Sequence, residues 1–143
     1  MKGIKAVLAL ALLVSLPVMA ACTAGTPALE DIKWVLTDYS VNDVTKSLLP
    51  DRDVTILFIS KDKEVNGSGG CNSYFASYQV DGSNLSIPGP IAVTEMWCGD
   101  EIGEQERIYL EALQAAESYK VEGDKLSINC GNIVLYFKSR NQT

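Results

Sequence analysis

The chain has 143 residues, of which 12 are basic, 18 are acidic and none is histidine. Without histidine, neither a Cys-His pair nor a Ser-His-Asp triad can form, and zinc sites built on histidine are excluded as well. The net charge of −6 repels phosphate backbones, so we expect no nucleic-acid partner.

The start of the chain has the pattern of a secretory signal. Lys2 and Lys5 precede an apolar run over residues 6–21, which ends in small residues before Cys22. This run is shorter than the roughly 20 apolar residues that a membrane span needs, and a proline interrupts it. We therefore predict a signal peptide over residues 1–21 and exclude it from the folded domain.

Cys22 is predicted to carry a lipid. The sequence MAAC at positions 19–22 resembles a bacterial lipobox, whose cysteine is lipidated and becomes the mature amino terminus. Residues 22–29 are mostly small, as a flexible tether would be. The alternative is ordinary cleavage that leaves Cys22 as a free thiol. With the lipid, we expect an exported protein anchored in the cell envelope, at the outer membrane of a two-membrane cell because Thr23 is not aspartate.

The first part of the mature chain predicts strands. Residues 32–39 (IKWVLTDY) are rich in β-branched and aromatic types. Residues 40–53 show no steady period and contain a proline, so we expect a surface connection there. Residues 54–60 (VTILFIS) form the clearest strand, and residues 64–70 are expected to return antiparallel to it.

A glycine-rich bend is predicted at residues 67–72 (GSGGCN). Glycine within a strand pattern usually marks a bulge or a close approach of the backbone. Residues 74–80 then predict a strand, which turns at residues 81–84 (DGSN) and returns as residues 85–87. We expect Asn72 to bond to backbone at this bend rather than to a substrate.

One helix is predicted near residues 101–117. Its apolar residues recur at steps of three and four, which is typical of an amphipathic helix; they are Ile102, Tyr109, Leu113 and Ala116. Asp100 is expected to be the N-cap. Because negative charge is favourable at a helix start, we expect the acidic residues there to be solvated rather than to form a catalytic pair. They are Asp100, Glu101, Glu104 and Glu106.

Residues 119–137 predict a meander of three strands with turns at residues 122–124 and 130–132. An order of many strands, one helix and more strands indicates a mainly β (α+β) domain. We expect a single antiparallel, barrel-like sheet with the helix packed over an open end or face. Residues 30–138 are predicted to form this domain, followed by a tail over residues 139–143.

Three cysteines remain once Cys22 is set aside for the lipid. In an exported protein cysteines tend to form disulfides, and three of them allow at most one bond. A bond between Cys71 and Cys98 would close a loop of about 28 residues and contribute about 3 kcal/mol. Cys130, at a hairpin turn, is then the expected free thiol. Cys71 could instead be a redox-sensitive thiol, a ligand or a nucleophile, but without a C-x-x-C spacing we expect no metal site.

Several of these motifs together resemble one known family. The chain from about Leu29 to Phe137 is similar to the META domain, the HslJ-like domain of bacterial envelope and heat-inducible lipoproteins. The matching features are Trp34, GGCNSY at residues 69–74, Tyr78, TEMWC at residues 94–98, the helix residues Gln105, Tyr109, Leu110 and Leu113, and Leu126 and Phe137. Trp97 departs from the family, which usually has a small residue there.

The resemblance implies a lipocalin-sized β-barrel with an inserted helix. It implies no catalytic residues and no cofactor, and the family's paired cysteines correspond to Cys71 and Cys98. Some members are tied to envelope stress and antibiotic tolerance, so a role of that kind is expected for this chain.

We therefore expect a non-enzymatic envelope lipoprotein that binds a protein partner. Its candidate binding surface consists of Trp34, Asn72, Tyr74, Tyr78 and Trp97, although aromatic residues more often belong to a core. One alternative is a carrier of a small hydrophobic ligand, in a barrel lined by Trp34, Phe58, Tyr74 and Phe75. Another is a protease-inhibitor or pilot-type binding module, which predicts an exposed apolar patch or strand edge.

Overall fold

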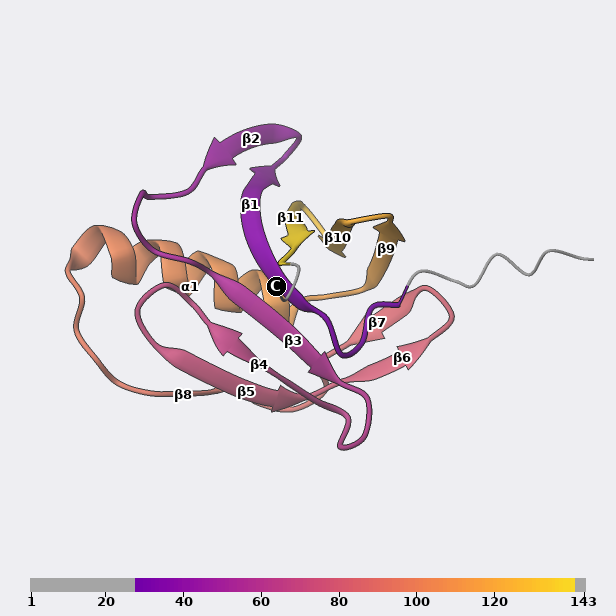
Figure 1. Ribbon diagram of the computed structural model, residues 1–143. Helices are drawn as coiled ribbons and strands as arrows, with labels where there is room; N and C mark the ends of the chain where they lie inside the picture. Colours follow the sequence, from indigo (N-terminus) through magenta and orange to yellow (C-terminus); the bar gives the residue numbers. More distant parts are fainter. Residues whose placement is uncertain (1–27, 141–143) are drawn as a thin grey trace, which may run out of the picture.

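The computed structural model describes residues 28–140 (Figure 1). The predicted signal peptide, Cys22 and most of the predicted tether lie outside these residues. The described chain forms an 11-stranded sheet and one helix. In chain order the elements are β1 (Lys33–Val41), β2 (Val44–Ser47), β3 (Thr55–Ile59), β4 (Glu64–Ser68), β5 (Ser73–Ser77), β6 (Gln79–Asp81), β7 (Asn84–Ser86), β8 (Ala92–Val93), α1 (Asp100–Gln114), β9 (Ser118–Glu122), β10 (Lys125–Cys130) and β11 (Ile133–Ser139).

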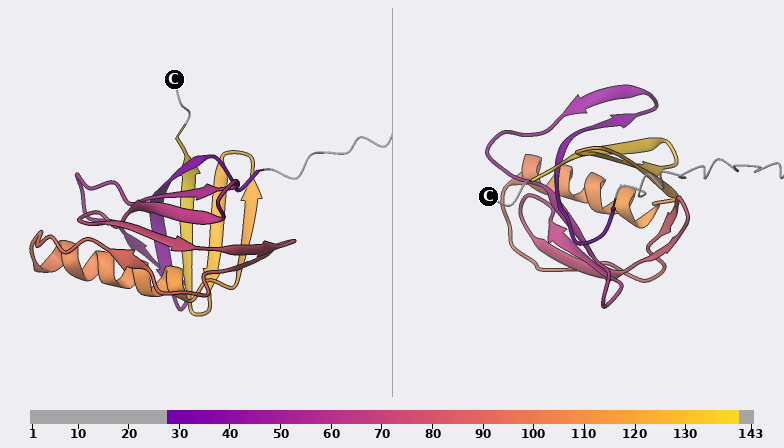
Figure 2. Two further views of the ribbon diagram at one scale, coloured as in Figure 1. Left: turned by 90° about the horizontal axis from the view of Figure 1, so that it is seen from below. Right: turned by 45° about the vertical axis from the view of Figure 1, so that its right-hand side comes forward.

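The sheet is antiparallel and curled. Its strands lie in the order β6-β7-β9-β10-β11-β1-β3-β4-β5-β8, and β2 pairs with β1 outside this order. β5 and β6 lie at or next to opposite ends of the order, yet Tyr78 alone separates them in the chain. The sheet must therefore curl until its two ends approach each other, and α1 crosses the open side of the curl (Figure 2). The predicted mainly β, antiparallel, barrel-like fold is confirmed.

Residues 40–53 contain a strand that the sequence analysis did not predict. β1 runs on to Val41, and β2 returns along it after a turn at Asn42 and Asp43. Both turn residues have positive φ, as in the two-residue hairpin turns whose twist matches that of the flanking strands. All four residues of β2 are exposed, so no buried face imposes a period of two on its sequence.

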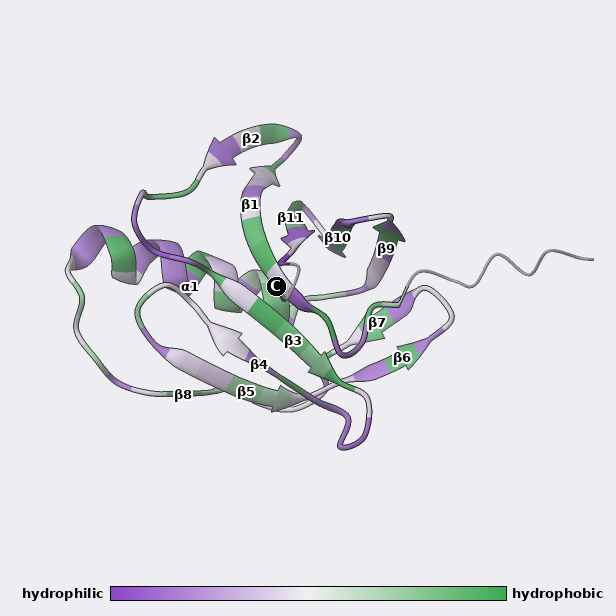
Figure 3. Cartoon of the chain, in the orientation of Figure 1, coloured by the Kyte–Doolittle hydropathy of each residue, from purple (hydrophilic) through white to green (hydrophobic). Residues whose placement is uncertain are grey.

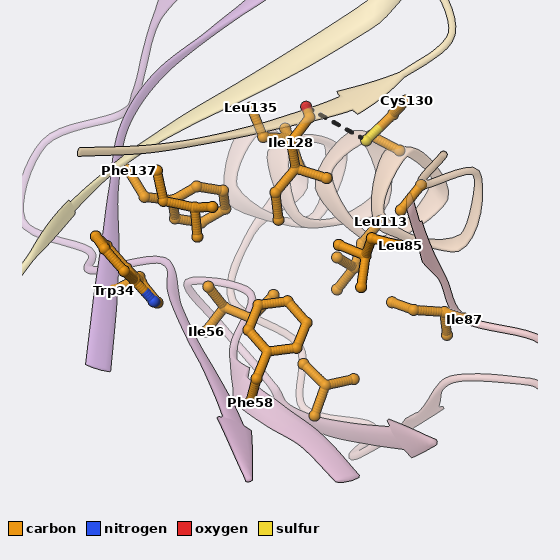
Figure 4. Close-up of a cluster of buried hydrophobic side chains, with 14 of the residues drawn as sticks. Trp34, Ile56, Phe58, Leu85, Ile87, Leu113, Ile128, Cys130, Leu135 and Phe137 are labelled. Carbon is orange, nitrogen blue, oxygen red and sulfur yellow. Dashed lines mark hydrogen bonds between the residues drawn. The ribbon is translucent and has the colours of Figure 1, made fainter. Parts of the chain in front are cut away.

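The core lies between the concave face of the sheet and α1. Side chains from both halves of the sheet and from the helix meet there (Figure 4); they include Trp34, Ile56, Phe58, Leu85, Leu113, Ile128, Leu135 and Phe137. Trp34, Phe58 and Tyr74, which would line the barrel of a ligand carrier, are buried in this cluster, whereas Phe75 is exposed. Three of the four residues named for a ligand-carrying barrel therefore belong to the hydrophobic core.

α1 carries hydrophobic residues interleaved with hydrophilic ones, as an amphipathic helix should (Figure 3). It ends at Gln114, three residues before the predicted end. Gly99, and not Asp100, is the N-cap residue, because the chain enters the helix with a φ of 94° that favours glycine. The helix is neither long enough nor apolar enough to cross a membrane.

The start of the described chain is anchored to the core. Leu29, which the sequence analysis assigned to the tether, is buried, and its carbonyl oxygen accepts a hydrogen bond from Nε1 of Trp34 at 3.0 Å. Asp31 accepts hydrogen bonds from the backbone nitrogen and the hydroxyl of Ser60, at 3.1 and 2.6 Å. In Figures 1 and 2 this segment lies at the opposite end of the molecule from the start of α1.

Candidate functional site

A disulfide joins Cys71 to Cys98, with Cα atoms 5.9 Å apart, as the sequence analysis expected. Cys71 belongs to the glycine-rich bend between β4 and β5, and Cys98 lies shortly before α1. The bond therefore ties the bend to the segment that leads into the helix. We name residues 94–99, between β8 and α1, the Trp97 loop.

The glycines of the bend allow it to close around a side chain of α1. A Cβ atom at Gly69 would lie 2.6 Å from side-chain atoms of Glu106. Gly70 has a φ of +102°, which strains residues that carry a Cβ atom. The predicted close approach therefore occurs between the bend and the helix.

The side chain that the bend encloses is the carboxylate of Glu106, which is 7% exposed. Its Oε2 accepts hydrogen bonds from the backbone nitrogens of Asn72 at 2.6 Å and Cys71 at 3.1 Å. Its Oε1 accepts one from Nδ2 of Asn72 at 2.7 Å. The expectation of a solvated acid was therefore wrong for Glu106, whereas Asp100, Glu101 and Glu104 are exposed. N–H donors compensate for the burial of this charge.

Asn72 carries this network on to the Trp97 loop. Its Oδ1 accepts hydrogen bonds from the backbone nitrogen of Met96 at 2.7 Å and from the hydroxyl of Thr94 at 2.9 Å. Its Nδ2 also donates to the carbonyl oxygen of Met96 at 3.2 Å. The side chain thus bonds to backbone, as expected, but to that of the Trp97 loop.

The Trp97 loop presents two large apolar side chains to solvent. Met96 is 60% exposed and Trp97 is 85% exposed. The backbone before the indole is held by Asn72, and the backbone after it is held by the disulfide at Cys98. Trp97 therefore extends from a loop that is fixed on both sides.

Trp97 is the exposed member of the predicted binding surface. The other four members are buried, and the prediction was wrong for them; they are Trp34, Asn72, Tyr74 and Tyr78. The three aromatic residues lie on the inner face of the curled sheet, where apolar area is removed from water. An aromatic residue type does not by itself show which face it occupies.

The buried tyrosines use their hydroxyls within the fold. Tyr74 donates to the carbonyl oxygen of Thr55 at 3.0 Å and shares a hydrogen bond of 2.6 Å with the hydroxyl of Tyr109. Burial raises the pKa of both tyrosines above its usual range. These hydroxyls remain protonated and are not free to act as bases at neutral pH.

Tyr78 lies in a second polar cluster, near the start of the described chain. It donates a hydrogen bond to the carboxylate of Glu30, which also accepts one from Nζ of Lys63 at 2.6 Å. The hydrogen bond from Lys63, followed by that from Tyr78, lowers the pKa of Glu30. Burial, followed by the bond to Glu30, raises the pKa of Tyr78. This cluster fastens the first described residues to the sheet.

Cys130 is a free thiol, as expected, and it is buried. Burial, with a smaller contribution from the charge of Glu117, raises its pKa to about 12. A thiol needs to ionise to act as a nucleophile, so Cys130 is unreactive at neutral pH.

Two residues of α1 position the surrounding loops, a role that the sequence analysis did not predict for either of them. Gln105, through Oε1, accepts a hydrogen bond from the backbone nitrogen of Leu49 at 2.7 Å, and Glu106 holds the glycine-rich bend. Both are buried. Glu106 lies three residues before Tyr109, on the buried stripe of the helix, so the helical period itself indicated that this acid faces inward.

Comparison with solved structures supports the fold. The chain is similar to a protein from Burkholderia xenovorans solved by NMR, with a TM-score of 0.69 and 23% identity over 80% of this chain and 85% of that one. A second NMR structure has a TM-score of 0.59 and 24% identity, covering 77% of this chain and 90% of that one. A crystal structure of a DUF4847 family protein from Bacteroides vulgatus has a TM-score of 0.55 and 16% identity, covering 78% and 94%.

These identities are low, so the structural likeness shows the fold alone. No curated protein sequence matches this chain. The family model of the META domain matches residues 27–142, which include every described strand and the helix. The chain therefore belongs to the META domain family.

Proposed function

We propose that this protein is an exported, lipid-anchored envelope protein that binds a protein partner without catalysing a reaction. The Trp97 loop is its binding surface. This reading keeps the binding-module hypothesis, which predicts an exposed apolar patch, and drops the internal ligand carrier. A role in envelope stress or antibiotic tolerance would follow from the partner that is bound.

The exposure of Trp97 on a fixed loop is the observation that carries the proposal. Exposed single apolar residues are common, but here two adjacent large ones stand on backbone held by a disulfide and a buried network. A loop already fixed in one conformation loses little entropy on binding. Tryptophan is also enriched among the residues that contribute most to protein–protein affinity.

The described polar residues support a role without catalysis. Glu106, Asn72 and Tyr74 would be natural candidates for acid, base or substrate contacts, but each is buried and hydrogen-bonded within the fold. A catalytic site requires such groups to converge on a space that a substrate can enter.

Export and lipidation rest on the sequence pattern at residues 1–22. The disulfide agrees with an oxidising compartment outside the cytoplasm. The short segment between Cys22 and the buried Leu29 would keep the domain close to the membrane surface.

Lipidation is tested by comparing the full-length protein with Cys22→Ser in a bacterial host. Mass spectrometry of the amino-terminal peptide should find a diacylglycerol-modified Cys22, and the wild-type protein should fractionate with membranes. Cys22→Ser should lose both the lipid and the membrane fraction. A wild-type protein that is cleaved but carries no lipid would contradict the anchor.

Partner binding is tested with a photoreactive amino acid placed singly at four exposed apolar positions of the full-length protein in cells. These positions are Val44, Phe75, Met96 and Tyr136. A discrete adduct with another protein at one or more positions is expected. If no position gives an adduct, the binding function is wrong.

A further inference from the structure

We infer that the Trp97 loop docks into an apolar pocket of a partner protein whose rim carries lysine or arginine side chains. The inference rests on the proposed function and adds the chemistry of the partner surface and the direction in which the partner lies. It is carried by the charge around the indole and by the place of the loop relative to the start of the domain.

The charge around Trp97 is negative. Glu95 precedes it in the loop, Asp100 and Glu101 follow it at the start of α1, and all three side chains are exposed. Residues 81–106 contain no lysine or arginine. An apolar side chain surrounded by carboxylates is complementary to an apolar pocket surrounded by cations, and such complementarity also speeds the encounter.

The nearby basic residues Arg107 and Arg52 do not neutralise the carboxylates around Trp97. Arg107 of α1 forms exposed ion pairs with two glutamates of the same helix, at 2.7 Å each. Arg52 lies near the bend, with its Cβ atom 3.9 Å from the position of a Cβ atom at Gly70, but Asp51 precedes it in the chain. Asp53, on its other side, pairs with Arg140 at 2.6 Å. Among the described residues Glu95, Asp100 and Glu101 form no ion pair, so the charge next to Trp97 in the chain is negative.

A membrane is a poor occupant for this surface. Anionic headgroups would be repelled by Glu95, Asp100 and Glu101, since membrane-binding segments use lysine and arginine. The described chain also begins at the opposite end of the molecule from the start of α1 (Figure 1). A lipid at Cys22 would hold the first end toward the membrane, and the Trp97 loop would then face away from it.

A second copy of the chain is also a poor occupant. In a symmetric dimer the same surface patch meets itself, so the carboxylates of one copy would face those of the other. Like charges placed together in this way cost free energy. The partner is therefore a different protein.

The test uses the full-length protein in cells with a photoreactive amino acid in place of Met96. The adduct yield of this protein is compared with that of the same protein carrying Trp97→Ala. Val44, which is 57% exposed on β2, is the matched control position for Met96, which is 60% exposed. We expect a discrete adduct at Met96 that decreases about tenfold or more with Trp97→Ala, as for a residue at the centre of an interface. An adduct at Met96 that persists unchanged in Trp97→Ala would overturn the inference.

Charge is tested in the same background with Glu95→Gln combined with Glu101→Gln. Fewer carboxylates should lower the adduct yield severalfold, because they weaken the electrostatic attraction to the partner. The yield measured in isolated envelopes should then also depend less on salt concentration. The partner identified by mass spectrometry should show a basic-rimmed apolar surface, and charge reversal there should lower the yield in the same way. An unchanged yield and salt dependence would contradict the basic rim.

Two further measurements on the purified protein test whether the Trp97 loop binds a second copy of the chain or a membrane instead. Sedimentation should show no self-association that depends on Trp97. Vesicles of phosphatidylethanolamine and phosphatidylglycerol should not bind the unlipidated domain. Self-association or vesicle binding that is lost in Trp97→Ala would replace the inferred partner with a second copy or a membrane.

The outcomes separate this inference from the proposed function. Adducts at Val44, Phe75 or Tyr136 but not at Met96 would leave a protein-binding function in place and remove the role of the Trp97 loop. The absence of adducts at all four positions would remove both.

Discussion

The two tryptophans of this protein differ in their exposure to solvent and in how they relate to the fold. Trp34 has no exposed area, donates its indole N–H to Leu29, and contributes its surface to the core. Trp97 is 85% exposed, although the backbone on both sides of it is held by buried interactions. Trp34 stabilises the fold. Trp97 does not, but the fold holds the loop that exposes it to solvent.

This contrast predicts the largest effect at Trp34. Trp34→Ala should lower the free energy of unfolding by about 4 kcal/mol, because it removes a large buried ring and leaves a cavity. Urea unfolding of the two proteins measures the difference. Trp34→Phe, which retains most of the ring but not the N–H, should lose less. A loss below about 1 kcal/mol for Trp34→Ala would contradict its place at the centre of the core.

The disulfide comes next. Replacing Cys71 and Cys98 together by alanine should cost about 3 kcal/mol, since the bond restricts the unfolded chain. Urea unfolding without reductant should show the loss, and reductant should produce a similar loss in the wild-type protein but none in the double variant. Hydrogen exchange should increase in the Trp97 loop more than in β10 and β11. Equal protection of the loop with and without the bond would show that the disulfide does not hold it.

Glu106 is expected to contribute somewhat less. Glu106→Gln should cost about 2 kcal/mol, because the new amide nitrogen would face N–H donors that now meet a carboxylate oxygen. Asn72 cannot turn its own amide to compensate without losing its hydrogen bonds to Met96 and Thr94. Glu104→Gln is the control on the same helix: it loses only an exposed, solvent-screened ion pair and should cost clearly less than Glu106→Gln. Equal losses for the two variants would mean that the burial of Glu106 has no energetic role.

Raising the pH from 7 to 10 should produce a smaller effect through Cys130, a loss of about 1.4 kcal/mol. The thiol ionises near its ordinary pKa of 9.0 in the unfolded chain but near 12 in the folded one. Between these values the unfolded state binds fewer protons, so stability falls as pH rises, by up to about 1.4 kcal/mol per pH unit. Cys130→Ala should flatten the decline in unfolding midpoint above pH 9. An identical pH profile in Cys130→Ala would show that the thiol does not titrate as described.

The smallest effect is expected at Trp97. Trp97→Ala should change the free energy of unfolding by less than about 0.5 kcal/mol, because the side chain removes little area from water. The same urea experiment used for Trp34→Ala measures it. A loss of about 2 kcal/mol or more would mean that the indole supports the fold, and the contrast between the two tryptophans would fail.

Local patterns in the sequence predicted much of this architecture. β3 and the amphipathic α1 follow from periods of two and of 3.6 residues, which depend on near neighbours in the chain. The pairing of Cys71 with Cys98 was expected from the compartment and from the resemblance to the META domain. β2 escaped prediction because its side chains are all exposed and its pairing depends on the turn at Asn42 and Asp43.

The candidate site was predicted less well than the fold. Asn72 and Tyr74 lie in one conspicuous motif with Cys71, yet both are buried, and the motif holds a loop that comes later in the chain. Glu106 was assigned to solvent because acids at a helix start usually are solvated. Its burial depends on a bend 34 residues earlier in the chain.

The sequence by itself determined the family, the type of most elements, the cysteine pair and the acidic character of the chain. The family, the element types and the acidic character come from residue types and short spacings, whereas the cysteine pair was expected from the compartment and from the resemblance to the META domain. The tertiary structure decided which tryptophan is buried, where Glu106 finds its hydrogen-bond donors and which loop is presented to a partner. The physical reason is that burial is set by contacts between segments far apart in the chain, and a local pattern carries no information about which segment will cover it.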